Sequence, residues 1–292
     1  MVKNCIASVK RRPIILVLLA VFTLVISIAE QFNPLTKKIG SLSNLFKTDY
    51  LTHMANLLNS IKNIGSTPTI LAIALLFVII LMFAIGSILG VILSGYFQVF
   101  YLSLFERKPK RGEFVAGINK HFFKMALMIS IVTLITAIFL ILAGFALVPA
   151  VSMFHVFMSG NSGVFYTMII LIILTAFIMF FSLVFFLMYL SYIFPSATAF
   201  KKGSFIVAFR MVNAYCWYLI PRIFGFTVLL IALQTGLLAM GYGLSSIGSS
   251  IGVILLNWIL KTVILFPYAY FVFSTFRDMK DDMFTEAEPA IA

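Results

Sequence analysis

The sequence has little charge for its length. Of its 292 residues only 10% are Asp, Glu, Lys or Arg, whereas 62% are apolar or aromatic, and the mean hydropathy is +1.12. A water-soluble globule of this size needs more polar surface than this composition supplies. The chain is therefore predicted to be an integral membrane protein, without a soluble enzymatic domain on either side of the bilayer.

Cysteine and histidine are also scarce. Cys5 and Cys216 both fall in segments predicted to be cytoplasmic, where thiols stay reduced, so no disulfide is expected. His53, His121 and His155 lie in three different parts of the predicted topology and cannot share a metal ion. No phosphate-binding glycine loop or zinc-protease helix is present. The sequence therefore predicts no cofactor, no metal and no catalytic residue.

Long apolar runs dominate the chain instead. Six are long enough to cross a bilayer as helices, and they cover residues 14–32, 69–105, 125–148, 164–194, 219–243 and 252–276. The fold class predicted from them is an all-α polytopic membrane bundle that forms one domain over residues 1–292. An even number of crossings places both termini on the same side.

The basic residues define that side. Sixteen of the 21 Lys and Arg residues lie in the segments 1–13, 106–124, 195–218 and 277–292 or at their borders, four lie in the segment 33–68, and Lys261 lies within a span. Basic residues concentrate in cytoplasmic loops. Both termini are therefore predicted to be cytoplasmic. A cleaved signal peptide is the alternative for the first run, because Ser27-Ile28-Ala29 resembles a cleavage site.

The two long cytoplasmic connections resemble each other. The residues 110–118 and 201–209 share a pattern of two basic residues, Gly, a polar residue and Phe, and Tyr-Leu-Ser precedes each, at 101–103 and 189–191. This predicts a parallel internal repeat. Each copy would contain a long descending helix, an amphipathic elbow at 106–124 or 195–218, and an ascending helix.

The elbows carry basic side chains that can reach lipid phosphates. The predicted contacts to anionic lipid are Lys110, Arg111, Lys120, Lys124, Lys201, Lys202 and Arg210. The alternative is that the elbows only return the chain to the bilayer.

Glycine spacing in the second run predicts close helix packing. Gly86, Gly90 and Ser94 are spaced four residues apart, which lets a neighbouring helix approach closely. Gly95 offers a bend beyond them, and Pro195 is predicted to end the fourth run.

Two segments are candidates for protein partners. Residues 42–64 have apolar side chains at helical spacing and form the predicted external amphipathic helix, which either docks a partner, covers a cavity or only packs down. The acidic tail 277–292 is the second candidate. Membrane lipids are expected partners, and nucleic acid is not.

Lys261 is the ionisable group placed deepest in a predicted span. A buried ammonium is unfavourable without a partner. Asn257 lies one helical turn away, Gln234 lies in the fifth span, and Glu30 lies at the outer end of the first. These four residues are the predicted ligand or lipid site, and the alternative is that Lys261 only pairs or reaches toward the interface.

One stretch resembles a known group of proteins. Tyr192-Ile193-Phe194-Pro195, followed by Lys202-Gly203-Ser204-Phe205 and Ala208-Phe209, resembles uncharacterised bacterial six-span membrane proteins, including the membrane domain fused to some glycerophosphodiester phosphodiesterases. The resemblance covers residues 69–276 and implies six helices in a bacterial plasma membrane. It assigns no functional residue, and the phosphodiesterase domain is absent from this sequence.

Three functions are open at this point. The leading hypothesis is a non-enzymatic membrane protein that handles or senses an amphiphile, such as a lipid or membrane-active peptide, or that serves as a transport or envelope accessory subunit. The alternatives are a structural scaffold subunit and a membrane-embedded enzyme that modifies lipid.

Overall fold

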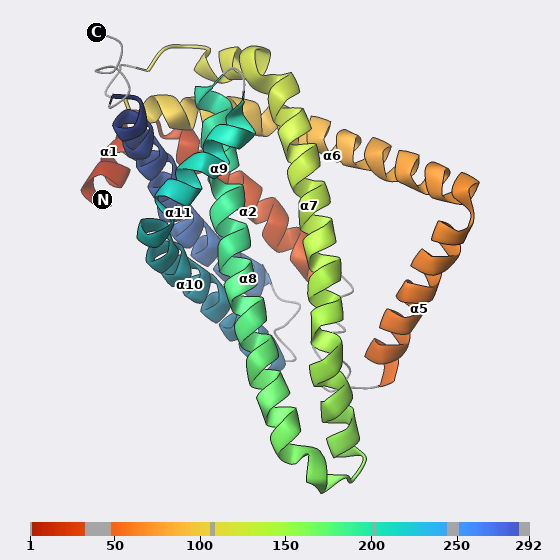
Figure 1. The fold of residues 1–292 in the computed structure, drawn as a ribbon. Coiled ribbons are helices and arrows are strands. Elements are labelled where there is room, and N and C mark those ends of the chain that lie inside the picture. The colour runs from red at the N-terminus through yellow and green to blue at the C-terminus, as the bar shows by residue number, and fades with distance from the viewer. Residues whose placement is uncertain (1, 33–47, 106–108, 201–202, 244–250, 286–292) are drawn as a thin grey trace. The chain divides into compact units, whose positions relative to one another are not determined.

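The computed structural model is built of helices (Figure 1), and it describes residues 2–32, 48–105, 109–200, 203–243 and 251–285. In chain order the elements are α1 (Val2–Arg11), α2 (Ile14–Phe32), α5 (Thr48–Ser66), α6 (Pro68–Ser103), α7 (Glu113–Met158), η1 (Ser162–Val164), α8 (Phe165–Ala199), α9 (Ser204–Ala214), α10 (Cys216–Gly243) and α11 (Ile251–Thr285). No strand occurs in these ranges.

Five of the described helices are long and apolar enough to cross a membrane: α6, α7, η1 with α8, α10 and α11. Many of their large apolar side chains are exposed, among them Ile79, Ile88 and Ile173. This much exposed apolar surface is unfavourable in water and normal in lipid. The predicted fold class, an all-α polytopic membrane bundle, is confirmed.

The predicted first span corresponds to α2, which has 19 residues. Its segment Ile14–Glu30 is apolar but shorter than the other five spans. A spanning helix needs about 20 residues, so α2 lies near the lower limit and the count of six crossings stays a prediction.

The chain divides into two compact units. The first contains Met1–Asn33, Ser87–Met128 and Val184–Ala292, and the second contains Pro34–Gly86 and Ile129–Leu183. Each of the helices α6, α7 and α8 is divided between the two units, with one part in each.

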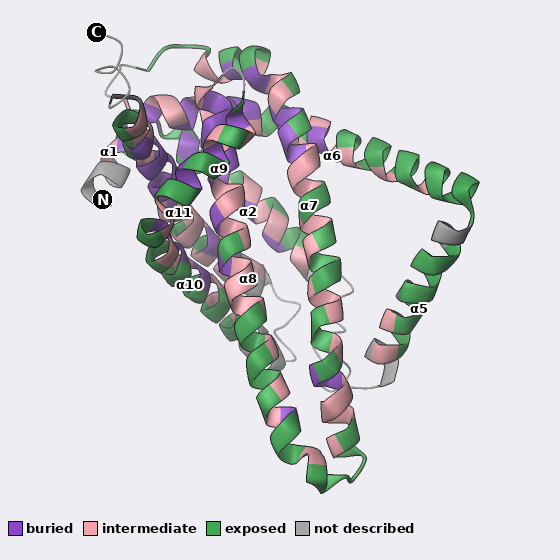
Figure 2. Cartoon of the chain, in the orientation of Figure 1, coloured by how far each residue is buried: buried purple, intermediate pink, exposed green. Residues whose placement is uncertain are grey.

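The first unit has its core along α2 and α11, which pack together over much of their length. Polar groups help to join them: the hydroxyls of Thr23 and Thr262 are 2.7 Å apart, and the indole of Trp258 donates to the Ala20 carbonyl at 2.6 Å. Burial along these helices is visible in Figure 2. The helix α2 is therefore an integral part of this unit, and its retention as the first span stays a prediction.

Aromatic rings and glycines pack the first unit further. The ring of Phe100 lies 4.8 Å from that of Phe273 and is 1% exposed. A Cβ added to Gly90 would lie 3.0 Å from the Cα of Ala126, so the predicted close approach of another helix at Gly90 is confirmed. Gly95 does not end α6, which continues to Ser103, and its lack of a side chain leaves room for the ring of Phe114.

The second unit contains α5 and a helical hairpin formed by the end of α7 and the beginning of α8 (Figure 1). The turn uses Gly160 at φ 100°, a conformation that suits glycine. His155 falls between the predicted spans 125–148 and 164–194 but lies in the last turn of α7, because the helix continues past Pro149.

The predicted external helix 42–64 is partly described. Residues 48–66 form α5, whereas residues 42–47 lie outside the described residues. Leu51, Met54 and Leu57 are half-buried along one face, while Leu58 and Ile61 are exposed.

The two predicted elbows differ in form. The first is continuous with the following span, since α7 runs for 46 residues from Glu113, or about 69 Å, and only part of it fits a bilayer core of about 30 Å. The second is a separate helix, α9, which ends at Ala214. Its last turn is held by Asn213, whose side-chain oxygen accepts from the Tyr189 hydroxyl at 2.5 Å.

The helix α8 also differs from the prediction, because it includes Pro195 and ends at Ala199. Proline removes one backbone donor, which is tolerated when other bonds hold the last turn. Here Ser196 donates to the Ser204 carbonyl at 2.7 Å, and the Lys124 ammonium donates to the carbonyls of Ala197 and Phe200.

Candidate functional site

The predicted cluster around Lys261 forms in part. The Lys261 ammonium is ion-paired with the Glu30 carboxylate, and the Asn257 amide donates to the same carboxylate oxygen at 3.0 Å. Lys261 and Asn257 are four residues apart on α11, so both point toward the end of α2. Gln234 is half-buried on α10 and has no hydrogen bond to these three residues.

The burial of the pair is uneven. The Lys261 side chain is 6% exposed and that of Glu30 is 37% exposed, so only the carboxylate reaches the surface. The side-chain oxygen of Asn257 is buried without a hydrogen-bond partner among the described residues. The predicted pairing of Lys261 with Glu30 is thus confirmed, and ligand binding by this cluster stays a prediction.

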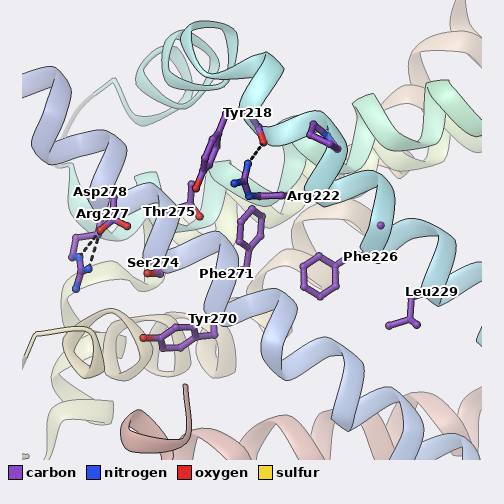
Figure 3. Close-up of a pocket in the computed structure, with 12 residues that line it drawn as sticks. Tyr218, Arg222, Phe226, Leu229, Tyr270, Phe271, Ser274, Thr275, Arg277 and Asp278 are labelled. Carbon is purple, nitrogen blue, oxygen red and sulfur yellow. Dashed lines mark hydrogen bonds and ion pairs between the residues drawn. The ribbon is translucent and has the colours of Figure 1, made fainter. Parts of the chain in front are cut away.

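A larger site lies between α10 and α11, within the first unit. It is a cavity of about 670 Å³, which is ample for a small ligand. Twelve residues line it (Figure 3): Tyr218, Pro221, Arg222, Gly225, Phe226, Leu229, Tyr270, Phe271, Ser274, Thr275, Arg277 and Asp278. We call it the α10–α11 pocket.

The α10–α11 pocket has two chemically different ends. The charged pair Arg277–Asp278 lies at one end, and Phe226 and Leu229 lie toward the other (Figure 3). Arg222 and Leu229 are seven residues apart on α10, which is about 10 Å along a helix. The pocket therefore has a polar part and an apolar part, as an amphiphile does.

Arg222 is held by Tyr218, one turn before it on α10. Its guanidinium carbon lies 3.5 Å from the centre of the Tyr218 ring, and one of its nitrogens donates to the Tyr218 carbonyl at 2.7 Å. Stacking on a ring fixes the plane of a guanidinium and leaves its edges open for hydrogen bonds. No acidic side chain pairs with Arg222 in the described part of the chain.

Arg277 uses all three of its nitrogens. Nε and Nη2 donate to one carboxylate oxygen of Asp278 at 3.1 and 2.8 Å, and Nη1 donates to the Leu104 carbonyl at 3.0 Å. The Asp278 side chain is 60% exposed, so this ion pair contributes little stability. The bond to Leu104 connects the α10–α11 pocket to the chain just after α6.

A second arginine bonds to the end of α6. Arg12 is 3% exposed and makes two bonds to the Glu113 carboxylate, at 2.9 and 3.0 Å, and one to the Leu102 carbonyl at 3.1 Å. These hydrogen bonds hold the pKa of Glu113 below its usual range. Arg12 therefore joins the chain before α2 to the end of α6 and the beginning of α7.

The basic elbow residues have different environments. Lys110, Arg111, Lys120 and Arg210 are exposed, as lipid contacts require. Lys124 is half-buried, donates to the end of α8, and has its pKa lowered by burial. Lys201 and Lys202 lie outside the described residues. Contact of these residues with anionic lipid stays a prediction.

His121 is the buried titratable group of the first elbow. Burial, together with the charges of Lys120 and Lys124, lowers its pKa to about 4. Its Nε2 has no hydrogen-bond partner among the described residues. The described side chains also contain no group of three His, Cys, Asp or Glu residues that can hold a metal ion.

Sequence reasoning missed the α10–α11 pocket. The residues Tyr218, Arg222 and Tyr270 carry no shared local motif, and none of them was predicted to belong to a site. The sequence did contain a signal for a shared polar site. Arg222 and Arg277 lie at the predicted cytoplasmic ends of two consecutive spans, with Tyr218 four residues before the first and Ser274-Thr275 just before the second.

Comparison with protein families, with curated proteins and with solved structures finds no match to this chain. The resemblance to six-span bacterial membrane proteins therefore stays an expectation.

Proposed function

We propose that this is a non-enzymatic multispan membrane protein that binds an amphiphile, a lipid or a membrane-active peptide, in the α10–α11 pocket. One observation carries the proposal: a cavity of about 670 Å³ has two arginines among its lining residues and apolar side chains toward one end. An amphiphile is the class of ligand that satisfies both parts at once.

The predicted topology supports this placement. If both termini are cytoplasmic and α2 forms the first of six crossings, Arg222 and Arg277 lie near the cytoplasmic headgroup layer, and Leu229 lies deeper. A lipid headgroup would then meet the arginines, and its acyl chain would follow Phe226 and Leu229 into the bilayer.

The chemistry of the lining favours binding over catalysis. Its charged members are two arginines and Asp278, and the carboxylate of Asp278 is bound to Arg277. General acid–base or nucleophilic chemistry needs a base within hydrogen-bond reach of a nucleophile. The described lining residues show no such pair, so support for the lipid-modifying enzyme is weaker.

An accessory subunit is the second candidate, and α5 favours it. Leu58 is 56% exposed and Ile61 is 50% exposed on this helix, which is too polar to be among the five spans. Exposed apolar residues on such a helix suit contact with the outer leaflet or with a partner subunit. The acidic tail 277–292 is the other proposed partner contact, although residues 286–292 lie outside the described residues.

The proposal is tested with a substitution that fills the α10–α11 pocket. A Cβ added at Gly225 meets no atom within 4 Å, so Gly225→Phe places a ring in the cavity without a backbone clash. Gly236 on the same helix is equally open and does not line the pocket, which makes Gly236→Phe the matched control. Native mass spectrometry of protein released in mild detergent then measures retained lipid or peptide.

We expect the wild type and Gly236→Phe to retain the same small molecule and Gly225→Phe to lose it. Equal retention by all three proteins would overturn the proposal. A stoichiometric protein partner without any retained small molecule would favour the accessory subunit.

A further inference from the structure

We propose that the amphiphile of the α10–α11 pocket is a lipid with an acidic head, whose two oxygens bond to the Nε–Nη2 edge of Arg222. This inference rests on the proposed function and adds the charge of the head and the residue that selects it. The acidic head can be a fatty-acid carboxylate or a lipid phosphate, because both present two anionic oxygens to one edge of a guanidinium group.

Arg222 has one bonded nitrogen and one open edge. Its Nη1 donates to the Tyr218 carbonyl at 2.7 Å, whereas Nε and Nη2 make no hydrogen bond to the described residues. No ion pair links Arg222 to an acidic side chain in those ranges either. Because Arg222 is exposed and lines the cavity, a ligand can reach the open edge.

Tyr218 fixes the direction of this edge. The guanidinium carbon lies 3.5 Å from the centre of the Tyr218 ring, and the carbonyl of the same residue accepts the bond from Nη1. Figure 3 shows the guanidinium among the lining side chains, next to Tyr218. The ring restrains the plane of the guanidinium and the carbonyl restrains its rotation, so an anion that binds there has less side-chain motion to arrest.

Arg277 takes no part in holding the head. Its three nitrogens are already bonded to Asp278 and to the Leu104 carbonyl, and Figure 3 shows its side chain directed away from Arg222. Of the two lining arginines, only Arg222 lacks a carboxylate partner in the described part of the chain. An anion at Arg222 therefore gains a charge-assisted contact without breaking an existing ion pair.

The apolar part of the pocket favours an acyl chain over a peptide. The backbone amides of a peptide would lie without hydrogen-bond partners against Phe226 and Leu229, which is unfavourable, whereas an acyl chain has no polar group to satisfy. Arg222 and Leu229 are about 10 Å apart along α10. An extended chain covers that length with about eight bonds, so an eight-carbon tail is a sufficient probe.

The test compares ligands that share one tail and differ only in the head. Full-length protein in an uncharged maltoside detergent is titrated by calorimetry with octanoate, octyl phosphate or octanol, and empty micelles correct for partition into the detergent. Octanol has the same tail without a negative charge. The variants are Arg222→Gln, Arg222→Lys and Gly225→Phe, and the control is Lys10→Gln, which removes an exposed charge on α1 that does not line the pocket.

We expect the wild type to bind octanoate or octyl phosphate about tenfold more tightly than octanol, the scale of one charge-assisted hydrogen bond. The tighter of the two acids identifies the chemistry of the head. Arg222→Gln should remove the preference for an acid. Arg222→Lys keeps the charge and loses the planar fork, so it should keep only part of the preference. Lys10→Gln should leave it unchanged.

Three results would overturn this inference. If octanol binds as tightly as both acids and Gly225→Phe weakens all three ligands, the acidic head is wrong and the proposed function stands. If Lys10→Gln lowers the preference as much as Arg222→Gln does, the preference comes from general surface charge. If Gly225→Phe changes the binding of no ligand, the proposed function itself fails.

Discussion

The ion pair between Lys261 and Glu30 makes an asymmetric stability prediction. Lys261 is almost fully buried, whereas the side chain of Glu30 is 37% exposed. Removing one partner of a buried pair costs about 3–5 kcal/mol, because the other charge stays buried and unpaired. The cost is smaller when the remaining charge can be hydrated.

Glu30→Gln leaves the buried ammonium without its carboxylate, so we expect a loss of about 3–5 kcal/mol in the free energy of unfolding. Lys261→Met leaves a carboxylate that reaches the surface, so we expect about 1–3 kcal/mol. The double variant removes both charges and should lie within about 1 kcal/mol of the wild type.

The assay is unfolding in mild detergent titrated with sodium dodecyl sulfate, followed by circular dichroism, for the wild type, both single variants and the double variant. Lys62→Met, at an exposed position of α5, serves as the control and should change stability by less than about 0.5 kcal/mol. The reasoning is refuted if Lys261→Met costs more than Glu30→Gln, or if the two losses add in the double variant.

The other predictions concern the first elbow and its packing. Arg12→Gln should destabilise by about 1–3 kcal/mol, because the half-buried Glu113 then loses two charge-assisted hydrogen bonds; thermal unfolding in detergent measures this, and Arg12→Lys should recover only part, since Lys lacks the planar fork. Because the pKa of Glu113 is lowered in the folded state, its contribution is present above the unfolded pKa near 4.5 and is lost as the pH falls through the folded value. The pKa of His121 is also lowered, from 6.5 to about 4, so between these values the unfolded chain binds a proton that the folded chain does not. The free energy of unfolding should therefore fall as the pH is lowered from 6.5 to 4. His121→Phe should flatten that part of the plot of stability against pH, and an unchanged plot would contradict the lowered pKa of His121. Gly117→Leu should destabilise because a Cβ there lies 2.6 Å from the Gln98 Cβ, whereas Gly236→Leu should be neutral or stabilising in the same melting assay.

Hydropathy and helical spacing predicted the features that depend on local sequence. The class of fold follows from apolar runs of spanning length, and residues 48–64 form a helix where the spacing predicted one. The approach of Lys261 to Glu30 was also predicted, because a buried ammonium needs an anion and acids are scarce within the predicted spans.

The features that the sequence did not reveal depend on contacts between distant residues. Arg12 and Glu113 are 101 positions apart, and each suits a cytoplasmic loop as well as an ion pair. Arg277 and Leu104 are 173 positions apart, and because every residue has a backbone carbonyl, the sequence does not indicate which one accepts a hydrogen bond. The α10–α11 pocket was missed for the same reason, since its lining comes from two helices and no local motif joins them.

The ends of the helices were also predicted poorly from the sequence. The prediction that Pro195 ends a helix assumed that the missing backbone donor decides the outcome. In the structure, Ser196 and Lys124 bond to the chain after Pro195, and α8 continues to Ala199. Tertiary hydrogen bonds of this kind override a local stop signal.

The most direct test of the central claim locates the bound amphiphile on the chain. A phospholipid with a photoreactive diazirine in its acyl chain is added to the full-length protein, irradiated, and mapped by peptide mass spectrometry. The account predicts crosslinks at Phe226, Leu229 and Phe271, which line the α10–α11 pocket, and their loss in Gly225→Phe but not in Gly236→Phe. Crosslinks spread over outward-facing residues such as Ile79 and Phe177, unchanged by Gly225→Phe, would contradict it.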